Sequence, residues 1–255
     1  MSKKTDYKNL NNKVVIISGG SQGIGKVMVE EFIKQKCLVY FLDIDSISAK
    51  KIINESNDEN YKPTFYECDV KDKSKLESII KDIGDKNNKI DVLINNAAND
   101  QRHKIEDVDE DFWNDRLDVN LSHAFFATKA AIPYLKKANY ASVINFSSIS
   151  WHLGMKDLVA YETAKAGIHG LTKSLARELG EFKIRVNAIV PGWIMTERQI
   201  DLWLTEELDK WRSEQQSLPE KIYPIDIANL ALFLASEDSK MITSQFHKID
   251  AGWMN

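Results

Sequence analysis

The sequence lacks the features that stabilise disulfide-rich or membrane-spanning proteins. It has only two cysteines, Cys37 and Cys68, and no CxxC pair, which excludes a disulfide scaffold and predicts two buried, reduced thiols. The longest uninterrupted apolar runs, such as residues 37–42, have six residues, whereas a membrane-spanning helix needs about 20. The first seven residues are polar, so we expect no signal peptide, no membrane partner and a cytoplasmic location.

An excess of basic charge is also missing. The chain has 34 Lys and Arg residues against 38 Asp and Glu residues, a net charge of −4, and we therefore expect no nucleic-acid partner. Apolar residues make up 43% and charged residues 28%, which is ordinary for a globular protein and excludes a disordered or collagen-like chain. There is no HExxH motif and the His and Cys residues are scattered, so we expect no metal site.

Short β-rich runs alternate with longer helical patterns along the chain. Strands are predicted at residues 13–18, 38–43, 64–67, 90–95, 141–147, 184–190 and 246–250. Helices are predicted at residues 22–36, 47–53, 74–83, 110–137 (bent near its end by Pro133), 159–182 and 224–235, and surface loops at 54–60 and 85–89. This alternation predicts an α/β fold: a doubly wound parallel sheet of about seven strands with helices on both faces, forming a single domain over residues 1–255.

A glycine-rich turn, residues 18–25 (SGGSQGIG), lies between the first predicted strand and the first predicted helix. Glycines let the backbone approach a pyrophosphate, and the helix N-terminus offers free N–H groups. A glycine-rich turn without a ligand is the alternative, and the position between strand and helix argues against it.

Asp43 ends the second predicted strand, 18 residues after Gly25, about where an acid hydrogen-bonds the adenosine ribose of a dinucleotide. A carboxylate there repels a 2′-phosphate, and no Lys or Arg lies in the turn or directly after Asp43. The sequence therefore predicts NAD rather than NADP. Asp43 as a mere turn residue is the alternative.

Tyr161 and Lys165 are four residues apart in a predicted helix and so lie on one face of it. A cation near a phenol stabilises the phenolate and lowers its pKa, which makes the pair suited to acid/base work. Ser148 ends the fifth predicted strand, at the sheet edge where catalytic side chains of open α/β sheets gather. A surface pair on an amphipathic helix is the alternative for Tyr161 and Lys165.

In this order the motifs resemble the short-chain dehydrogenase/reductase family, over nearly the whole chain from Lys13 onward. Further matching motifs are Cys68-Asp69-Val70, Asn95-Asn96-Ala97, Asn120 within Asp-Val-Asn-Leu, and Pro191-Gly192. The resemblance implies a Rossmann fold and a homotetramer. Ser18, Ala98 and Ala251 depart from the residues usual in the family, which weakens the comparison slightly at Ala98, close to the cofactor.

The resemblance also implies roles for individual residues. Tyr161 is the expected catalytic acid/base, Lys165 lowers its pKa and binds the nicotinamide ribose, Ser148 hydrogen-bonds the reacting oxygen, and Asn120 holds a water. Asp69 is expected at the adenine, and Ile194 and Thr196 at the nicotinamide carboxamide. The expected NAD-binding residues are Gly19, Ser21, Gln22, Gly23, Ile24, Gly25, Asp43, Asp69, Val70, Asn96, Ala97, Tyr161, Lys165, Pro191, Gly192, Ile194 and Thr196.

Residues 99–104, 148–154 and 249–253 are similar to the bacterial sugar 1-dehydrogenases of this family, which oxidise D-xylose, L-arabinose, D-galactose or L-fucose to the lactone. A sugar ring needs hydrogen-bonding groups and an aromatic wall for its C–H face. The expected substrate residues are Asn99, Arg102, His103, Ser148, Ser150, Trp151, His152 and Trp193. A carbonyl reductase, for example of 3-oxoacyl thioesters, and a non-catalytic dinucleotide-binding scaffold are the alternative functions.

Purely structural roles are the alternatives for several of these side chains. Trp151 could fill the core, His152 could be structural, and Arg102 and His103 could cap the next helix. We expect residues 193–217 to form a substrate lid in which Trp203 and Trp211 pack. Trp253 has two possible places, a subunit interface or a neighbour's pocket, and the sequence does not choose between them.

Overall fold

The seven strands of the computed structural model, which describes residues 6–56 and 58–254, form one sheet in the order β3-β2-β1-β4-β5-β6-β7. All neighbours pair in parallel. The strands are β1 (Val14–Ser18), β2 (Leu38–Asp43), β3 (Thr64–Glu67), β4 (Val92–Asn95), β5 (Ser142–Phe146), β6 (Arg185–Pro191) and β7 (Phe246–Ile249). The predicted doubly wound parallel sheet is confirmed.

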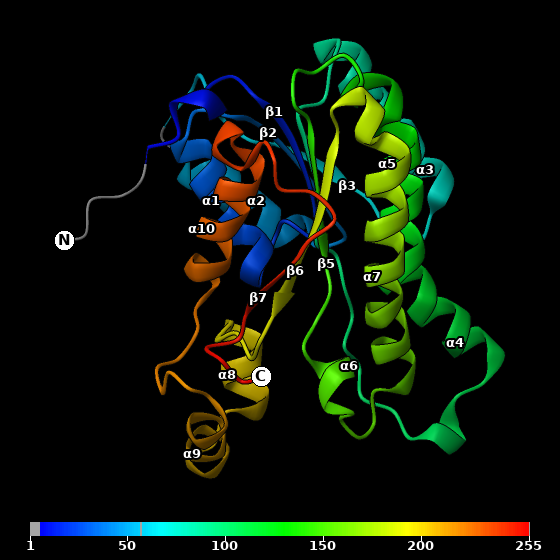
Figure 1. Cartoon of the computed structure of the whole chain (residues 1–255), viewed down its shortest axis with the longest axis vertical. Helices are drawn as coiled ribbons and strands as arrows, with labels where there is room; N and C mark the ends of the chain where they lie inside the picture. Colours follow the sequence, from blue (N-terminus) through cyan, green and yellow to red (C-terminus); the bar gives the residue numbers. More distant parts are fainter. Residues whose placement is uncertain (1–5, 57, 255) are drawn as a thin grey trace.

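Helices cover both faces of this sheet (Figure 1). On one face lie α1 (Gly23–Lys34), α2 (Ser46–Glu55) and α10 (Pro224–Ala235), and on the other α3 (Lys73–Asn87), α5 (His123–Leu135) and α7 (Val159–Leu179). Strand β1 shows why: Val15 and Ile17 pack into the first layer, whereas Val14 and Ile16 pack into the second. A strand buried on both faces needs apolar residues at every position, which is what its sequence provides.

The predicted helix over residues 110–137 is wrong as one element. It is divided into α4 (Glu110–Leu117), a π-helical turn (Asp118–Ser122) and α5, with Pro133 inside the last turn of α5. The Asn120 side chain donates to the Arg116 carbonyl at 2.9 Å, the acceptor that the Asn120 backbone N–H would use in an α-helix. Such π-turns are frequent at functional sites.

Other boundaries also differ from the prediction. α3 continues to Asn87, so most of the predicted loop 85–89 is helical, and Ser150–Leu153 form a short helix, α6, that periodicity did not indicate. The polar segment 196–216 folds into α8 (Glu197–Trp203) and α9 (Glu206–Gln215). Thr196 and Thr205 begin these two helices, because each side chain accepts a backbone N–H of the first turn.

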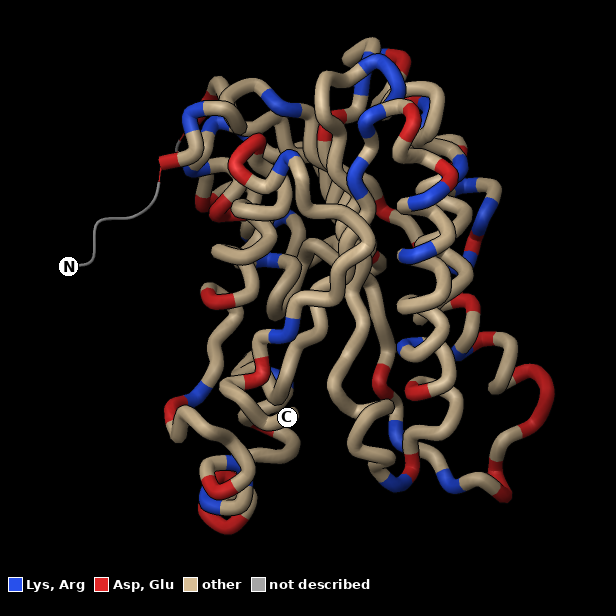
Figure 2. The backbone as a smooth tube through the Cα atoms, viewed as in Figure 1, with Lys and Arg blue, Asp and Glu red and all other residues tan. Residues whose placement is uncertain are grey.

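The carboxyl ends of the strands meet at the lower edge of the sheet in Figure 1, where α6 lies on one side and α8 and α9 on the other. Basic and acidic residues are scattered over the outer helices and loops, while the strands carry few charges (Figure 2). Cys37 and Cys68 are buried and unpaired, as expected. Within the described residues, no helix is both long and apolar enough to cross a membrane.

Candidate active site

The glycine turn between β1 and α1 leaves no room for side chains. Gly19 and Gly23 have φ angles of +68° and +53°, in the left-handed region that favours glycine. A Cβ on Gly25 would lie 1.8 Å from the Gly19 carbonyl oxygen, and one on Gly19 would lie 2.8 Å from Ala97 Cα. Ser18 ends β1, and its hydroxyl accepts the backbone N–H groups of Asn96 and Ala97, both at 3.1 Å. These two hydrogen bonds tie the glycine turn to the loop after β4.

A cavity of about 510 Å³, here called the cofactor cavity, runs along this turn. Of the expected NAD-binding residues, those lining it are Gly19, Gln22, Ile24, Gly25, Asp43, Asp69, Val70, Asn96, Ala97, Tyr161 and Thr196. Ser21 and Gly23 shape the turn without lining the cavity. The remaining four, Lys165, Pro191, Gly192 and Ile194, line a neighbouring cavity described below.

Asp43 and Asp45 place two carboxylates at the β2 end of the cofactor cavity. The Asp43 carboxylate accepts the backbone N–H groups of Ser21 at 2.9 Å and Asp45 at 3.1 Å, so it also fixes the glycine turn. Asp45 caps α2 and accepts a hydrogen bond from the Gln22 side chain. Hydrogen bonds, first of all from Ser48, lower the pKa of Asp45 to about 2, which keeps this end of the cavity negatively charged.

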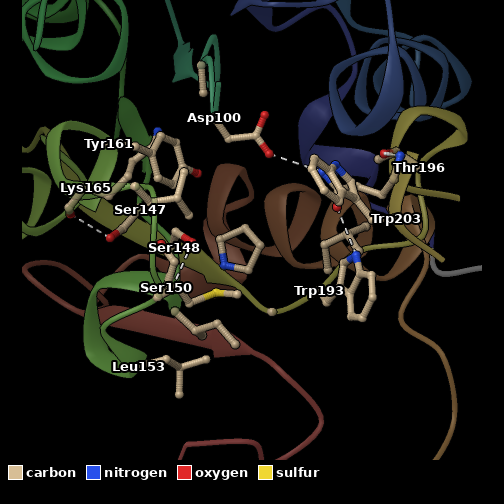
Figure 3. A pocket seen from close by; sticks show the side chains of 18 of the residues that line it. Asp100, Ser147, Ser148, Ser150, Leu153, Tyr161, Lys165, Trp193, Thr196 and Trp203 are labelled. Atoms are coloured by element: carbon tan, nitrogen blue, oxygen red, sulfur yellow. Dashed lines mark hydrogen bonds between the residues drawn. The ribbon is translucent and has the colours of Figure 1, made fainter. Parts of the chain in front are cut away.

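Ser148, Tyr161 and Lys165 meet in a second cavity of about 360 Å³, here called the substrate cavity, at the carboxyl ends of β5 and β6 (Figure 3). Tyr161 and Lys165 lie one turn apart on α7, with the Lys165 Nζ 5.7 Å from the centre of the Tyr161 ring. The Nζ donates to the Phe146 carbonyl at 2.9 Å. Tyr161 lines both cavities, so its phenol stands where they join.

Burial dominates the ionisation of this pair. It raises the pKa of Tyr161 well above 10, and the charge of Asp100 raises it further, while the Ser148 hydrogen bond and the charge of Arg102 lower it. Burial lowers the pKa of Lys165 to about 7, against the smaller opposing effect of Asp100. No lowering of the Tyr161 pKa by Lys165 is seen here: burial lowers the pKa of the lysine itself to about 7, and its Nζ donates to the Phe146 carbonyl.

Asn120 lies fully buried in the π-helical turn and lines neither cavity. Its Oδ1 accepts the Asn99 backbone N–H at 2.9 Å, and its Nδ2 donates to the carbonyls of Asn99 at 3.0 Å and Arg116 at 2.9 Å. The side chain therefore clamps the loop after β4 to the turn before α5. The water-holding role that the resemblance implies stays a prediction.

The aromatic wall of the substrate cavity is built by Trp193, Trp203, Trp211 and Trp253. The Trp193 Nε1 donates to the Gln199 side chain at 3.0 Å, and Trp211 meets Trp253 edge to face with ring centres 5.2 Å apart. Trp253 thus lines the cavity of its own chain. Trp203 and Trp211, expected as packing residues of the lid, face the cavity as well.

Two of the expected substrate residues, Trp151 and His152, do not line the cavity. The Trp151 ring stacks on His152 at 3.5 Å and meets His169 edge to face at 4.9 Å, and its Nε1 donates to the Ser147 hydroxyl at 3.3 Å. The reason is the helical turn of α6, which presents Ser150 and Leu153 to the cavity and carries Trp151 and His152 to another side.

The loop after β4 divides its expected residues between several roles. His103 lines neither cavity: one ring nitrogen pairs with the Gln101 carbonyl and the other accepts the Ala160 backbone N–H at the start of α7, which favours the capping alternative. Asn99 lines the cofactor cavity and holds Asn120. Arg102 lines the substrate cavity, together with Ser150 and Trp193 as expected.

Sequence reasoning did not assign Asp100, Gln199, Leu153 or Met155 to the site, yet all four line the substrate cavity. Asp100 lies in the polar segment 99–104, and Gln199 follows Trp193 and Thr196 in the expected lid. Clustering of polar and aromatic residues in those two segments is the signal that could have found them.

Comparison with known proteins agrees with this geometry. The family profile described as enoyl-(acyl carrier protein) reductase matches residues 19–254. D-xylose 1-dehydrogenase from Caulobacter vibrioides is 44% identical over 247 residues, which cover 97% of this chain and 98% of that protein. A probable galactose dehydrogenase from Rhizobium meliloti is 40% identical over 249 residues, 97% of each chain. The solved aldohexose dehydrogenase of Thermoplasma acidophilum superposes with a TM-score of 0.85 at 30% identity, covering 97% of this chain and 96% of that one.

Proposed function

Because the chain belongs to the short-chain dehydrogenase/reductase family, whose members use a nicotinamide cofactor, we propose that it oxidises an aldose at C1 to the sugar lactone with NAD. The observation that carries the proposal is the meeting of Ser148, Tyr161 and Lys165 with a tryptophan-walled cavity of about 360 Å³. The relatives named for D-xylose, galactose and aldohexose support this substrate class.

The residues of the cofactor cavity fit a dinucleotide. The turn leaves no room for a Cβ at Gly19 or Gly25, so backbone N–H groups at the start of α1 can approach a pyrophosphate closely. Asp43 and Asp45 favour NAD, because carboxylates repel a 2′-phosphate and Asp43 can accept from ribose hydroxyls. Ile194 and Thr196 would hold the nicotinamide side. When bound, the dinucleotide supplies the acceptor for the hydride that leaves C1.

The chain's own residues handle the proton. Oxidation of the anomeric carbon removes a hydride from C1 and a proton from its hydroxyl, and the Tyr161 oxygen takes that proton as general base. Since burial raises the pKa of Tyr161, its phenolate depends on the Ser148 hydrogen bond and on the positive charge of Arg102. The Ser148 hydroxyl has a single O–H, and it turns this donor to the oxygen on C1 as charge develops there.

The substrate cavity suits a ring with one apolar and one hydroxyl-bearing side. Tryptophan rings can stack on the C–H face of a sugar. Ser150 is 6% exposed and lines the cavity, and its hydroxyl finds no hydrogen-bond partner among the described residues. A buried hydroxyl without a partner costs free energy, so a ligand that supplies one is favoured. A fatty-acyl substrate would leave it unsatisfied.

The experiment that tests the proposal measures NADH formation by the purified protein with pentoses, hexoses and 6-deoxyhexoses, with NADP in parallel. We expect turnover with NAD on a few sugars that share a stereochemical feature. Ser150→Ala should raise the KM of the preferred sugar, with Ser174→Ala, an exposed serine of α7, as the matched control. No turnover on any sugar, together with reduction of a 3-oxoacyl thioester, would replace the proposal by the carbonyl reductase.

The homotetramer, the cytoplasmic location, the single domain over residues 1–255 and the lid over residues 193–217 are part of the same proposal. Segment 193–217 supports it as a lid, because it supplies Trp193, Trp203 and Trp211 to the cavity wall. Sedimentation of the purified protein tests the tetramer, and a monomer would contradict it.

A further inference from the structure

Asp100 connects the loop after β4 to helix α8 on the opposite side of the site (Figure 3). One carboxylate oxygen pairs with the Arg198 guanidinium, and the other accepts from the Gln199 Nε2 at 3.2 Å. Both partners lie on α8, about a hundred residues further along the chain. Asp100 lines both the substrate and the cofactor cavities, so this contact lies where the two join.

Helix α8 has no buried residue that would anchor it in the core. It has seven residues, and core packing does not determine its position. The Gln199 side chain links Asp100 to Trp193, because it also accepts a hydrogen bond from the Trp193 Nε1 at 3.0 Å. A second link comes from the same loop, since the Arg102 guanidinium lies 5.4 Å from the Trp203 ring centre. Polar contacts with the loop after β4 therefore place two tryptophans of the cavity wall.

The same carboxylate acts on the proton-handling pair. Its charge raises the pKa of Tyr161 and the pKa of Lys165, in each case as the largest influence after burial. Pairing with Arg198 keeps this charge at a fixed position, because the carboxylate is held from two sides.

We propose that Asp100 is a positioning residue of the sugar oxidation: it holds α8, with Trp203 and the linked Trp193, against the substrate, and its charge sets the pH range in which the site works. The inference rests on the proposed function for its kinetic part. It acts through Gln199, Arg198 and Trp193 on the substrate, and through the field of the carboxylate on Tyr161.

The position of α8 is tested without any sugar. Hydrogen–deuterium exchange of peptides covering Glu197–Trp203 is compared in wild type, Asp100→Asn and Asp107→Asn. Asp107 is exposed and has no side-chain hydrogen bond in the described structure, so its variant removes the same charge without the contact. We expect exchange to quicken by about tenfold in Asp100→Asn alone, the size expected for a charged hydrogen bond. Equal exchange in all three proteins would overturn the proposal.

Kinetics separate the contact from the charge. Gln199→Met breaks the link but keeps the Asp100 carboxylate, so the sugar KM should rise several-fold while the pH profile of kcat/KM stays in place. Asp100→Asn should raise KM by about tenfold and move both limbs of the profile to lower pH, because the pKa values of Tyr161 and Lys165 both fall when the negative charge is removed. An unchanged profile in Asp100→Asn would refute the electrostatic role. Lack of turnover by the wild type would instead refute the proposed function, and the exchange result would stand.

Discussion

The cofactor cavity and the substrate cavity share Tyr161 but are built in different ways. The first is shaped by backbone: its turn depends on glycines at positions where a Cβ would collide with neighbouring main chain. The second is shaped by side chains from several separate segments, among them the loop after β4, the α6 region, α7, the lid and the C-terminal Trp253. A site made of backbone tolerates few substitutions, whereas a site made of side chains can change its ligand by exchanging single residues.

The largest effect is expected at Tyr161, the proton carrier among the residues that line both cavities. Tyr161→Phe keeps the ring and removes the proton carrier, so turnover should fall by about a thousandfold or more, while NAD binding measured by calorimetry stays nearly unchanged. Tyr66→Phe is the matched control, because the Tyr66 hydroxyl bonds the surface residue Asp82 away from both cavities. Substantial activity in Tyr161→Phe would contradict the assignment of Tyr161 as the general base.

The backbone origin of the cofactor cavity is tested by two glycines. Gly25→Ala places a Cβ 1.8 Å from a carbonyl oxygen and should weaken NAD binding by at least about a hundredfold. Gly170→Ala is the control: it lies exposed within α7 with nothing inside 4 Å of its Cβ position, so it should raise the free energy of unfolding by about 0.5–1 kcal/mol. Calorimetry and urea unfolding measure the two effects. Tight NAD binding by Gly25→Ala would contradict the view that the backbone of the glycine turn shapes the cofactor cavity.

Cofactor preference comes next in size. Asp43→Ala should shift the ratio of NADP to NAD use by roughly tenfold or more and also weaken NAD itself, because the Ser21 N–H loses its acceptor. Asp45→Asn keeps a good helix cap and should shift the ratio in the same direction by less. A loss of NAD binding with no gain in NADP use would make Asp43 a turn residue only.

The smallest effect is expected in the aromatic wall. Trp203→Leu should raise the sugar KM by about fivefold and leave the KM for NAD unchanged, since it removes one stacking surface. Trp151→Leu removes the tryptophan that the sequence favoured but that lies outside the cavity, so the sugar KM should stay within about twofold of wild type. If Trp151→Leu has the larger effect, the side-chain wall is assigned to the wrong residues.

Much of the fold could be predicted because it follows from local patterns. Parallel strands buried on both faces are runs of β-branched and apolar residues, as in residues 13–18, and the strand ends place Ser148 and Asp43 at the right edge. The glycine turn could be predicted for a similar reason, because only glycine satisfies its backbone geometry.

The substrate side could be predicted only in part, because it depends on which way side chains point after the chain has folded. Residues 151 and 152 differ from residue 150 by one and two steps along a helical turn, and that rotation decides which of them face the cavity. The contact of Asp100 with Gln199 joins residues 99 positions apart, and no periodicity signals it. The π-turn at Asn120 is set by side-chain bonds to Arg116 and Asn99, which helix propensity does not encode.

Four of the six tryptophans of the chain line one cavity, and only Trp113 and Trp151 lie elsewhere. The intrinsic fluorescence of the protein is therefore weighted toward the place where the sugar is proposed to bind. A ligand that displaces water from that wall changes the surroundings of most of the emitters at once. Tryptophan emission can therefore report sugar binding without an added label. The dissociation constant of the sugar can be measured in this way even in variants that no longer turn over.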